Sequence, residues 1–144
     1  MRWVLLDEVL NIKRSKVSRT RSRFPDNNGE YGPQVLMIEM MAQTGALLVG
    51  LENDFKKDLI FAKIDDAEFG EDLIQGTPIE IEARVESLRP EGGWISSSIW
   101  ADGKKYAASR FLLMNVGHFL PNQTEPITFH PAFIEHFKIR EKIS

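Results

Sequence analysis

The longest apolar stretch of the chain covers residues 33–50 and predicts a single long helix. Its apolar residues lie all around the helical wheel, so we expect the helix to be buried on most sides. Pro33 is favoured in the first turn of a helix, and Gly32 before it can serve as the cap. Gly50 and Asn53 are both plausible ends of the helix. The rest of the chain can fold around this one helix.

Two polar residues, Glu39 and Gln43, interrupt the apolar helix. Because they are four residues apart they share one helix face, and the Gln43 amide can donate a hydrogen bond to the Glu39 carboxylate. Burying a carboxylate is costly unless it is paired. Glu39 is therefore the first candidate for a functional residue, and a satisfied buried carboxylate is the structural alternative.

Residues 16–24 alternate between two kinds of side chain in the manner of a strand. The two faces carry Arg19, Arg21 and Arg23 on one side and Ser18, Thr20 and Ser22 on the other. The arginine face predicts either a solvated surface or a docking surface for an acidic protein partner, because complementary charge speeds encounter.

Residues 78–88 give the clearest period-two pattern, with apolar side chains on one face and charged side chains on the other. Residues 94–101 and 106–116 predict two further strands, and Asp102-Gly103 between them is a strong signal for a tight hairpin. These three strands predict an antiparallel meander with one covered face.

Residues 3–12 predict a strand or a turn leading into one, and residues 58–69 predict a strand running into an irregular piece. With the meander they indicate an α+β fold, in which one antiparallel sheet curves around the buried helix. Residues 117–144 read as a loop followed by a short helix over 131–142. We expect one domain over 1–116 and a C-terminal extension over 117–144 that packs on it.

Composition narrows the function classes. The chain has 144 residues, a formal net charge of −3 and no cysteine. The charge argues against nucleic acid as a partner, and the lack of cysteine excludes disulfides and thiolate zinc sites. The three histidines lack paired ligand spacing, so we expect no metal. We expect neither a signal peptide nor a membrane span, and a cytoplasmic location.

The helix sequence at residues 33–45, PQVLMIEMMAQTG, resembles the motif P-G-V-L-x-[IL]-E-A-x-A-Q of the 3-hydroxyacyl-acyl-carrier-protein dehydratases. Residues 3–12 resemble the opening of that family, and residues 60–85 resemble its segment FAGIDKARFRRPVxPGDxLxLEV. The resemblance covers residues 1–116, roughly four-fifths of the chain, and stops before the C-terminal extension.

This resemblance implies a hot-dog fold and a dimer whose two sheets join edge to edge, or a higher assembly such as a trimer of dimers. It implies an acyl thioester as substrate, carried on the phosphopantetheine of acyl carrier protein or of coenzyme A, with no bound cofactor. It places the catalytic carboxylate at Glu39 with Gln43 beside it. It also places Pro33 and Gln34 against the substrate, where the Gln34 backbone N–H replaces that of a glycine in the motif.

The sequence departs from the family motif at the family's second catalytic residue, a histidine that acts as the base. Its place falls on Pro25, or on Arg23 if two residues are inserted, and the first histidine of the chain is His118. Neither residue can act as a general base, and the loss of a general base lowers the reaction rate by roughly 10²–10⁴-fold.

Four functions therefore stay open. The chain could be an atypical dehydratase that uses Glu39 alone or with a histidine of the C-terminal extension (His118, His130 or His136). It could be a subunit without the histidine in a heteromeric dehydratase, completed by a histidine-bearing paralogue. It could be a hot-dog thioesterase, in which a helix carboxylate acts without a histidine. The fourth function is non-catalytic acyl binding.

Overall fold

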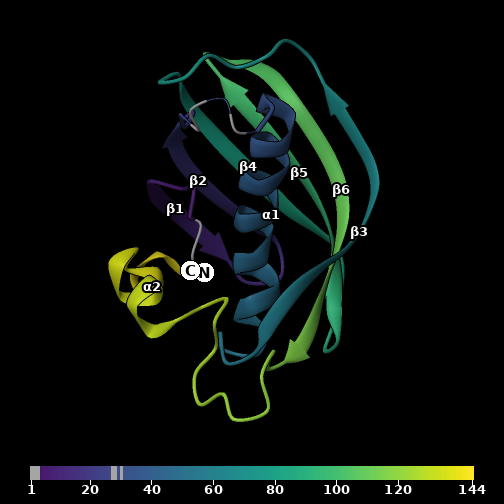
Figure 1. Cartoon of the computed structure of the whole chain (residues 1–144), viewed down its shortest axis with the longest axis vertical. Helices are drawn as coiled ribbons and strands as arrows, with labels where there is room; N and C mark the ends of the chain where they lie inside the picture. Colours follow the sequence, from purple (N-terminus) through teal and green to yellow (C-terminus); the bar gives the residue numbers. More distant parts are fainter. Residues whose placement is uncertain (1–3, 27–28, 30) are drawn as a thin grey trace.

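The computed structural model describes residues 4–26, 29 and 31–144. Six strands form one antiparallel sheet in the order β1-β2-β4-β5-β6-β3, and the sheet curves around the helix α1 (Figure 1). This is the α+β arrangement that the sequence pattern predicts, and it is the hot-dog fold that the resemblance implies. The elements are β1 (Glu8–Lys13), β2 (Val17–Arg23), α1 (Pro33–Leu51), β3 (Asp58–Phe69), β4 (Pro78–Arg89), β5 (Gly92–Ala101), β6 (Lys104–Gly117), α2 (Pro131–His136) and α3 (Ile139–Lys142).

The helix α1 begins as predicted, with Gly32 as its cap and Pro33 in its first turn. It is long and apolar enough to span a membrane, but 78% of its most apolar 18-residue segment is buried inside the fold. The helix ends at Leu51, between the two predicted ends, Gly50 and Asn53. Gly50 lies inside the helix, and a Cβ there would lie only 2.8 Å from Cζ of Phe129. This glycine therefore allows a close approach and does not end the helix.

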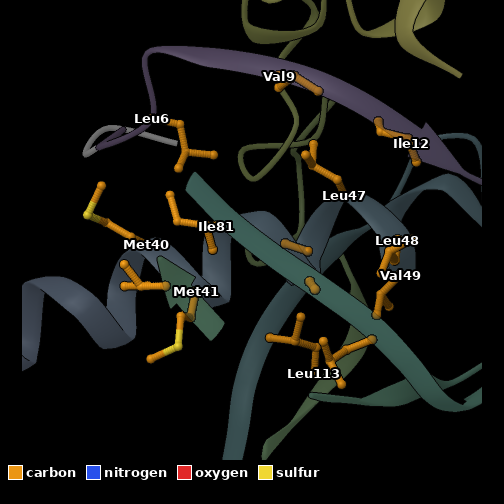
Figure 2. Close-up of a cluster of buried hydrophobic side chains, with 14 of the residues drawn as sticks. Leu6, Val9, Ile12, Met40, Met41, Leu47, Leu48, Val49, Ile81 and Leu113 are labelled. Atoms are coloured by element: carbon orange, nitrogen blue, oxygen red, sulfur yellow. The ribbon is translucent and has the colours of Figure 1, made fainter. Parts of the chain in front are cut away.

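The core lies between the concave face of the sheet and α1. Figure 2 shows Met40, Met41, Leu47, Leu48 and Val49 of α1 meeting side chains from β1, β4 and β6. The apolar face of the predicted meander points inward, with Ile79, Ile81 and Ala83 buried. Burial of these apolar side chains is the dominant favourable term in folding.

The hydroxyl face of β2 also points inward. Ser18, Thr20 and Ser22 are all buried. The Ser18 hydroxyl donates to the Thr44 carbonyl at 2.7 Å, and the hydroxyls of Thr20 and Thr44 are 2.8 Å apart. These hydrogen bonds attach α1 to the sheet. Because side chains alternate along a strand, the arginines of β2 lie on the outer face.

The irregular piece expected at the end of residues 58–69 is absent from the strand β3. The strand runs from Asp58 to Phe69. The irregularity is in its pairing with β6, where the register shifts between Phe61 and Lys63 and again between Ile64 and Asp66.

The C-terminal extension packs against the rest of the fold. The predicted single helix over 131–142 is wrong, because Lys138 adopts a left-handed conformation (φ 52°) that divides it into α2 and α3. Phe129, Phe133 and Ile139 join the hydrophobic core. The last residues lie along β1, where the Ser144 N–H donates to the Ile12 carbonyl at 2.9 Å.

Candidate functional site

Glu39 lies half-buried on α1, one turn before the buried Gln43. Gln43 Nε2 donates to Glu39 Oε1 at 3.0 Å, which confirms the predicted hydrogen bond. Gln43 Oε1 accepts from the Leu5 N–H at 2.9 Å. Because the Leu5 N–H can only donate, it fixes which end of the amide faces Glu39. The carboxylate is therefore held in place by a side chain that is itself oriented.

Glu39 lines a pocket of about 110 Å³ between α1 and β3, the last strand of the sheet on one side. The walls are mostly apolar or small; they are Ala42, Gln43 and Ala46 of α1, Leu59, Ile60 and Phe61 of β3, Leu113 of β6 and Thr128 of the C-terminal extension. At 1.5 Å per residue, Ala46 lies about 10 Å along the helix axis from Glu39. A polar group at one position of an apolar pocket suits a substrate with a reactive head and an apolar chain.

The structure places the other predicted substrate-binding residues elsewhere on the helix. Pro33 and Gln34 lie in the first turn of α1, five or six residues before Glu39, and neither lines its pocket. Gln34 is exposed. No side chain among the described residues caps this end of the helix, which keeps the positive end of the helix dipole.

The arginines of β2 lie on the outer face of the sheet and are largely paired. Arg19 forms an ion pair with Glu82 at 3.0 Å, and Arg21 forms one with Glu8 at 3.3 Å. The Arg23 guanidinium donates to the Gly76 carbonyl at 3.1 Å. Their positive charge is thus partly offset, and their role in docking stays a prediction.

The structure does not bring Pro25 or Arg23, the two positions aligned with the family histidine, into the pocket of Glu39. The histidines of the extension do not line it either. His118 lies 3.1 Å from Gln123, His130 caps α2 and lies 3.1 Å from Glu125, and His136 packs on Phe137. The extension does fold back, but the residue that it places in the pocket is Thr128.

Asp58, at the start of β3, is a buried residue that the sequence reasoning missed. Its Oδ1 accepts from the N–H groups of Ile127 and Thr128 at 2.6 and 2.7 Å, and its Oδ2 accepts from Gln123 Nε2 at 2.5 Å. The Leu59 N–H donates to the Thr128 hydroxyl at 3.1 Å. An aspartate that opens an apolar strand was the only signal, and its partners lie 65 to 70 residues away.

The ionisation of Asp58 follows from these contacts. Burial raises the pKa of this carboxyl, but the hydrogen bonds from Gln123, Thr128 and Ile127 together outweigh burial and hold the pKa below its ordinary value. The carboxylate is therefore charged at neutral pH, and both of its oxygens accept hydrogen bonds. Within the described residues, no cluster of side chains is suited to hold a metal ion.

Comparison with known proteins finds similar dehydratase sequences. No family model matches the chain. It is 29% identical to the 3-hydroxyacyl-[acyl-carrier-protein] dehydratase FabZ of Clostridium perfringens over 126 residues, 80% of this chain and 88% of the relative. A FabZ of Rickettsia akari is also 29% identical, over 123 residues, 78% of this chain and 85% of the relative.

Solved structures show the same fold. The dehydratase heterocomplex ApeI:P from Xenorhabdus doucetiae superposes with a TM-score of 0.67 at 19% identity, covering 85% of this chain and 86% of that one. A hypothetical thioesterase protein with coenzyme A from Streptococcus pneumoniae superposes with a TM-score of 0.61 at 11% identity, covering 76% and 85%. The chain therefore has the hot-dog fold, and its sequence is similar to FabZ dehydratases.

Proposed function

We propose that this protein processes acyl thioesters and acts, through Glu39, on 3-hydroxyacyl thioesters in the manner of a dehydratase. The observation that carries the proposal is the oriented pair of Glu39 and Gln43 in an apolar pocket. The similarity to FabZ dehydratases over 80% of the chain supports it. The substrate would be carried by acyl carrier protein or coenzyme A, with no bound cofactor.

The elimination needs two proton transfers. A base removes a proton from C2, the C3 hydroxyl leaves with one added proton as water, and the C2–C3 double bond forms while the thioester stays intact. Glu39 is suited to bind the hydroxyl and to supply its proton. Gln43 would keep the carboxyl group directed at the hydroxyl. The backbone N–H of Gln34, at the positive end of α1, could stabilise the enolate oxygen that forms.

The base at C2 is the part that Glu39 does not supply. Because no histidine of the chain lines the Glu39 pocket, we assign the base to a second subunit. In a heteromeric enzyme, a histidine-bearing paralogue would complete this site. The similarity in fold to the dehydratase heterocomplex ApeI:P supports such an assembly.

The edge of β3 is suited to the dimer contact. β3 ends the sheet on one side, and Ile60, Phe61 and Ile64 along it are exposed. If two β3 strands pair antiparallel around residue 64, Lys63 of each copy faces Asp65 of the other, an opposite-charge pair. A homodimer and a dimer with a similar paralogue would both use this edge.

A thioesterase is the second candidate. The hypothetical thioesterase protein of Streptococcus pneumoniae has the same fold, and a helix carboxylate can activate water or attack a thioester directly. In this case the product is a free acid, and no double bond forms.

The two functions are separated by their products. The purified chain, alone and mixed with a histidine-bearing paralogue, is incubated with 3-hydroxybutyryl-acyl carrier protein and with 3-hydroxybutyryl-coenzyme A. We expect a 2-enoyl thioester, and Glu39→Gln should lower its rate by roughly 10²–10⁴-fold. Release of free acid would support the thioesterase instead. A rate that Glu39→Gln leaves unchanged would contradict both functions.

A further inference from the structure

The Glu39 pocket follows a stripe of small residues along α1. At 3.6 residues per turn, Glu39, Ala46 and Gly50 lie within about 40° of one another around the helix axis. Ala42 and Ala46 line the pocket together with Glu39. Gly50 continues the same stripe one turn further, about 16 Å from Glu39 along the axis at 1.5 Å per residue. A straight apolar chain that enters beside Glu39 would run toward Gly50.

The protein's own Phe129 occupies this continuation. A Cβ on Gly50 would lie 2.8 Å from Cζ of Phe129 and 2.9 Å from Cδ1 of Phe55, so no side chain other than hydrogen fits beneath these rings. The two rings are in edge contact, with centroids 4.9 Å apart. Phe129 is buried (2% exposed), and its ring covers Gly50, the next residue of the stripe beyond the pocket.

The neighbouring Thr128 closes the same end of the pocket. Its hydroxyl accepts from the Leu59 N–H and is also hydrogen-bonded to Asp58. The methyl group is therefore the part of this side chain without a polar partner. Asp58 also binds the backbone of Ile127 and Thr128, so the segment is fixed to β3 by a buried carboxylate.

Thr128 and Phe129 separate two cavities. Thr128 lines the pocket of about 110 Å³ that contains Glu39. Phe129 lines a second cavity of about 660 Å³, together with Phe55, Pro126, Ile134, His118 and Arg140. The partition between the two is one turn of chain from the C-terminal extension, outside the part that resembles the dehydratases.

We propose that Thr128 and Phe129 form a stop that limits the protein to short acyl chains. The inference rests on the proposed function, since it takes the Glu39 pocket as the acyl site. The stop excludes long chains by occupying the place that their terminal carbons would need. Removing the Phe129 ring joins the small pocket to the larger cavity and lets longer chains bind.

The test measures binding separately from turnover. All variants carry Glu39→Gln, and calorimetry gives the dissociation constants of straight-chain 3-hydroxyacyl pantetheine thioesters from hydroxybutyryl to hydroxydodecanoyl. With the stop intact, affinity should rise over the first members and then fall. With Phe129→Ala, it should continue to rise by up to about fourfold per added methylene, the worth of one buried CH₂.

Matched variants separate the stop from general damage to the core. Phe133→Ala removes the same ring from the same aromatic cluster, but from a side chain that lines neither cavity, and should leave the preferred length unchanged. If Phe129→Ala does not fold, Thr128→Ser removes only the methyl group and should shift the preference toward longer chains. Thr128→Val keeps that bulk and should not.

An unchanged length preference in folded Phe129→Ala, or in Thr128→Ser, would overturn the inference. A parent protein that binds none of the thioesters would overturn it as well. A shifted preference supports the stop even if the wild-type chain forms no enoyl product, a result that would count against the proposed dehydration alone.

Discussion

Gln43 shows how a single buried amide can define a site. Its two ends bind Glu39 and the Leu5 backbone, and it is only 4% exposed. The spacing of Glu39 and Gln43 was enough to predict their hydrogen bond, because four residues make one helical turn. The contact with Leu5 spans 38 positions and depends on how the start of the chain packs. No periodicity in the sequence reports it.

Gln43→Leu should cost stability as well as activity. The substitution leaves the Leu5 N–H without its acceptor, and an unsatisfied group of this kind costs about 1–3 kcal/mol. Urea unfolding measures the free energy of unfolding, and the enoyl assay measures the accompanying loss in kcat. Glu39→Gln is the control, because it should remove activity while changing stability by less than about 0.5 kcal/mol. Equal losses of stability in both variants would count against this role of Gln43.

At the scale of elements, the C-terminal extension is the part that sequence reasoning described least well. One short helix over 131–142 was predicted there, and the structure has a helix that ends early because Lys138 adopts a left-handed conformation. The attachment of the extension through Asp58 was not predictable, since it joins the start of β3 to residues near 128. Gly50 was interpreted as a possible helix end because glycine is common there. No pattern in the sequence indicates that the Phe129 ring of this same extension lies against it.

Asp58 should make the attachment of the extension sensitive to acid. Because its pKa in the folded protein lies below the ordinary value of 3.8, its contribution to stability is fully present above that value. The contribution is lost as the pH falls through the lowered pKa. Unfolding free energies measured from pH 7 down to about pH 2 should fall more steeply for the wild type than for Asp58→Asn.

At neutral pH, Asp58→Asn should already be destabilised by about 1–3 kcal/mol or more, since an amide nitrogen replaces one acceptor oxygen. Hydrogen exchange at Thr128 and Ile127 should rise before exchange in α1 does, because the extension detaches first. Asp102→Asn, at an exposed hairpin, is the matched control and should change neither quantity. Parallel acid profiles for the wild type and Asp58→Asn would contradict this assignment.

At the scale of the whole molecule, the two edges of the sheet differ. The edge of β1 is covered by the C-terminal residues, through the Ile12–Ile143 bridge and the Ser144 N–H. The edge of β3 has exposed apolar side chains and, within the part of the chain that the structure describes, no pairing strand. One covered and one open edge favour a closed pair of subunits over an open-ended array.

Ile64→Lys tests this assembly. The residue is 42% exposed in the single chain, so the fold should tolerate the change, but two added charges would face each other across paired β3 edges. Light scattering should give a dimer mass for the wild type and a monomer mass for the variant. Ile74→Lys, in the loop after β3 and 78% exposed, is the matched control and should stay dimeric. A wild-type chain that is monomeric at every concentration would contradict the predicted contact.

The most direct test of the central claim is a crystal structure of the Glu39→Gln protein with a short 3-hydroxyacyl pantetheine thioester bound. We expect the 3-hydroxyl to lie within hydrogen-bonding distance, about 2.6–3.2 Å, of the side chain at position 39. We also expect the acyl chain to run along Ala42 and Ala46 and to end at Thr128. A thioester bound away from α1, or with its hydroxyl directed away from residue 39, would contradict the assignment of Glu39 as the catalytic carboxylate.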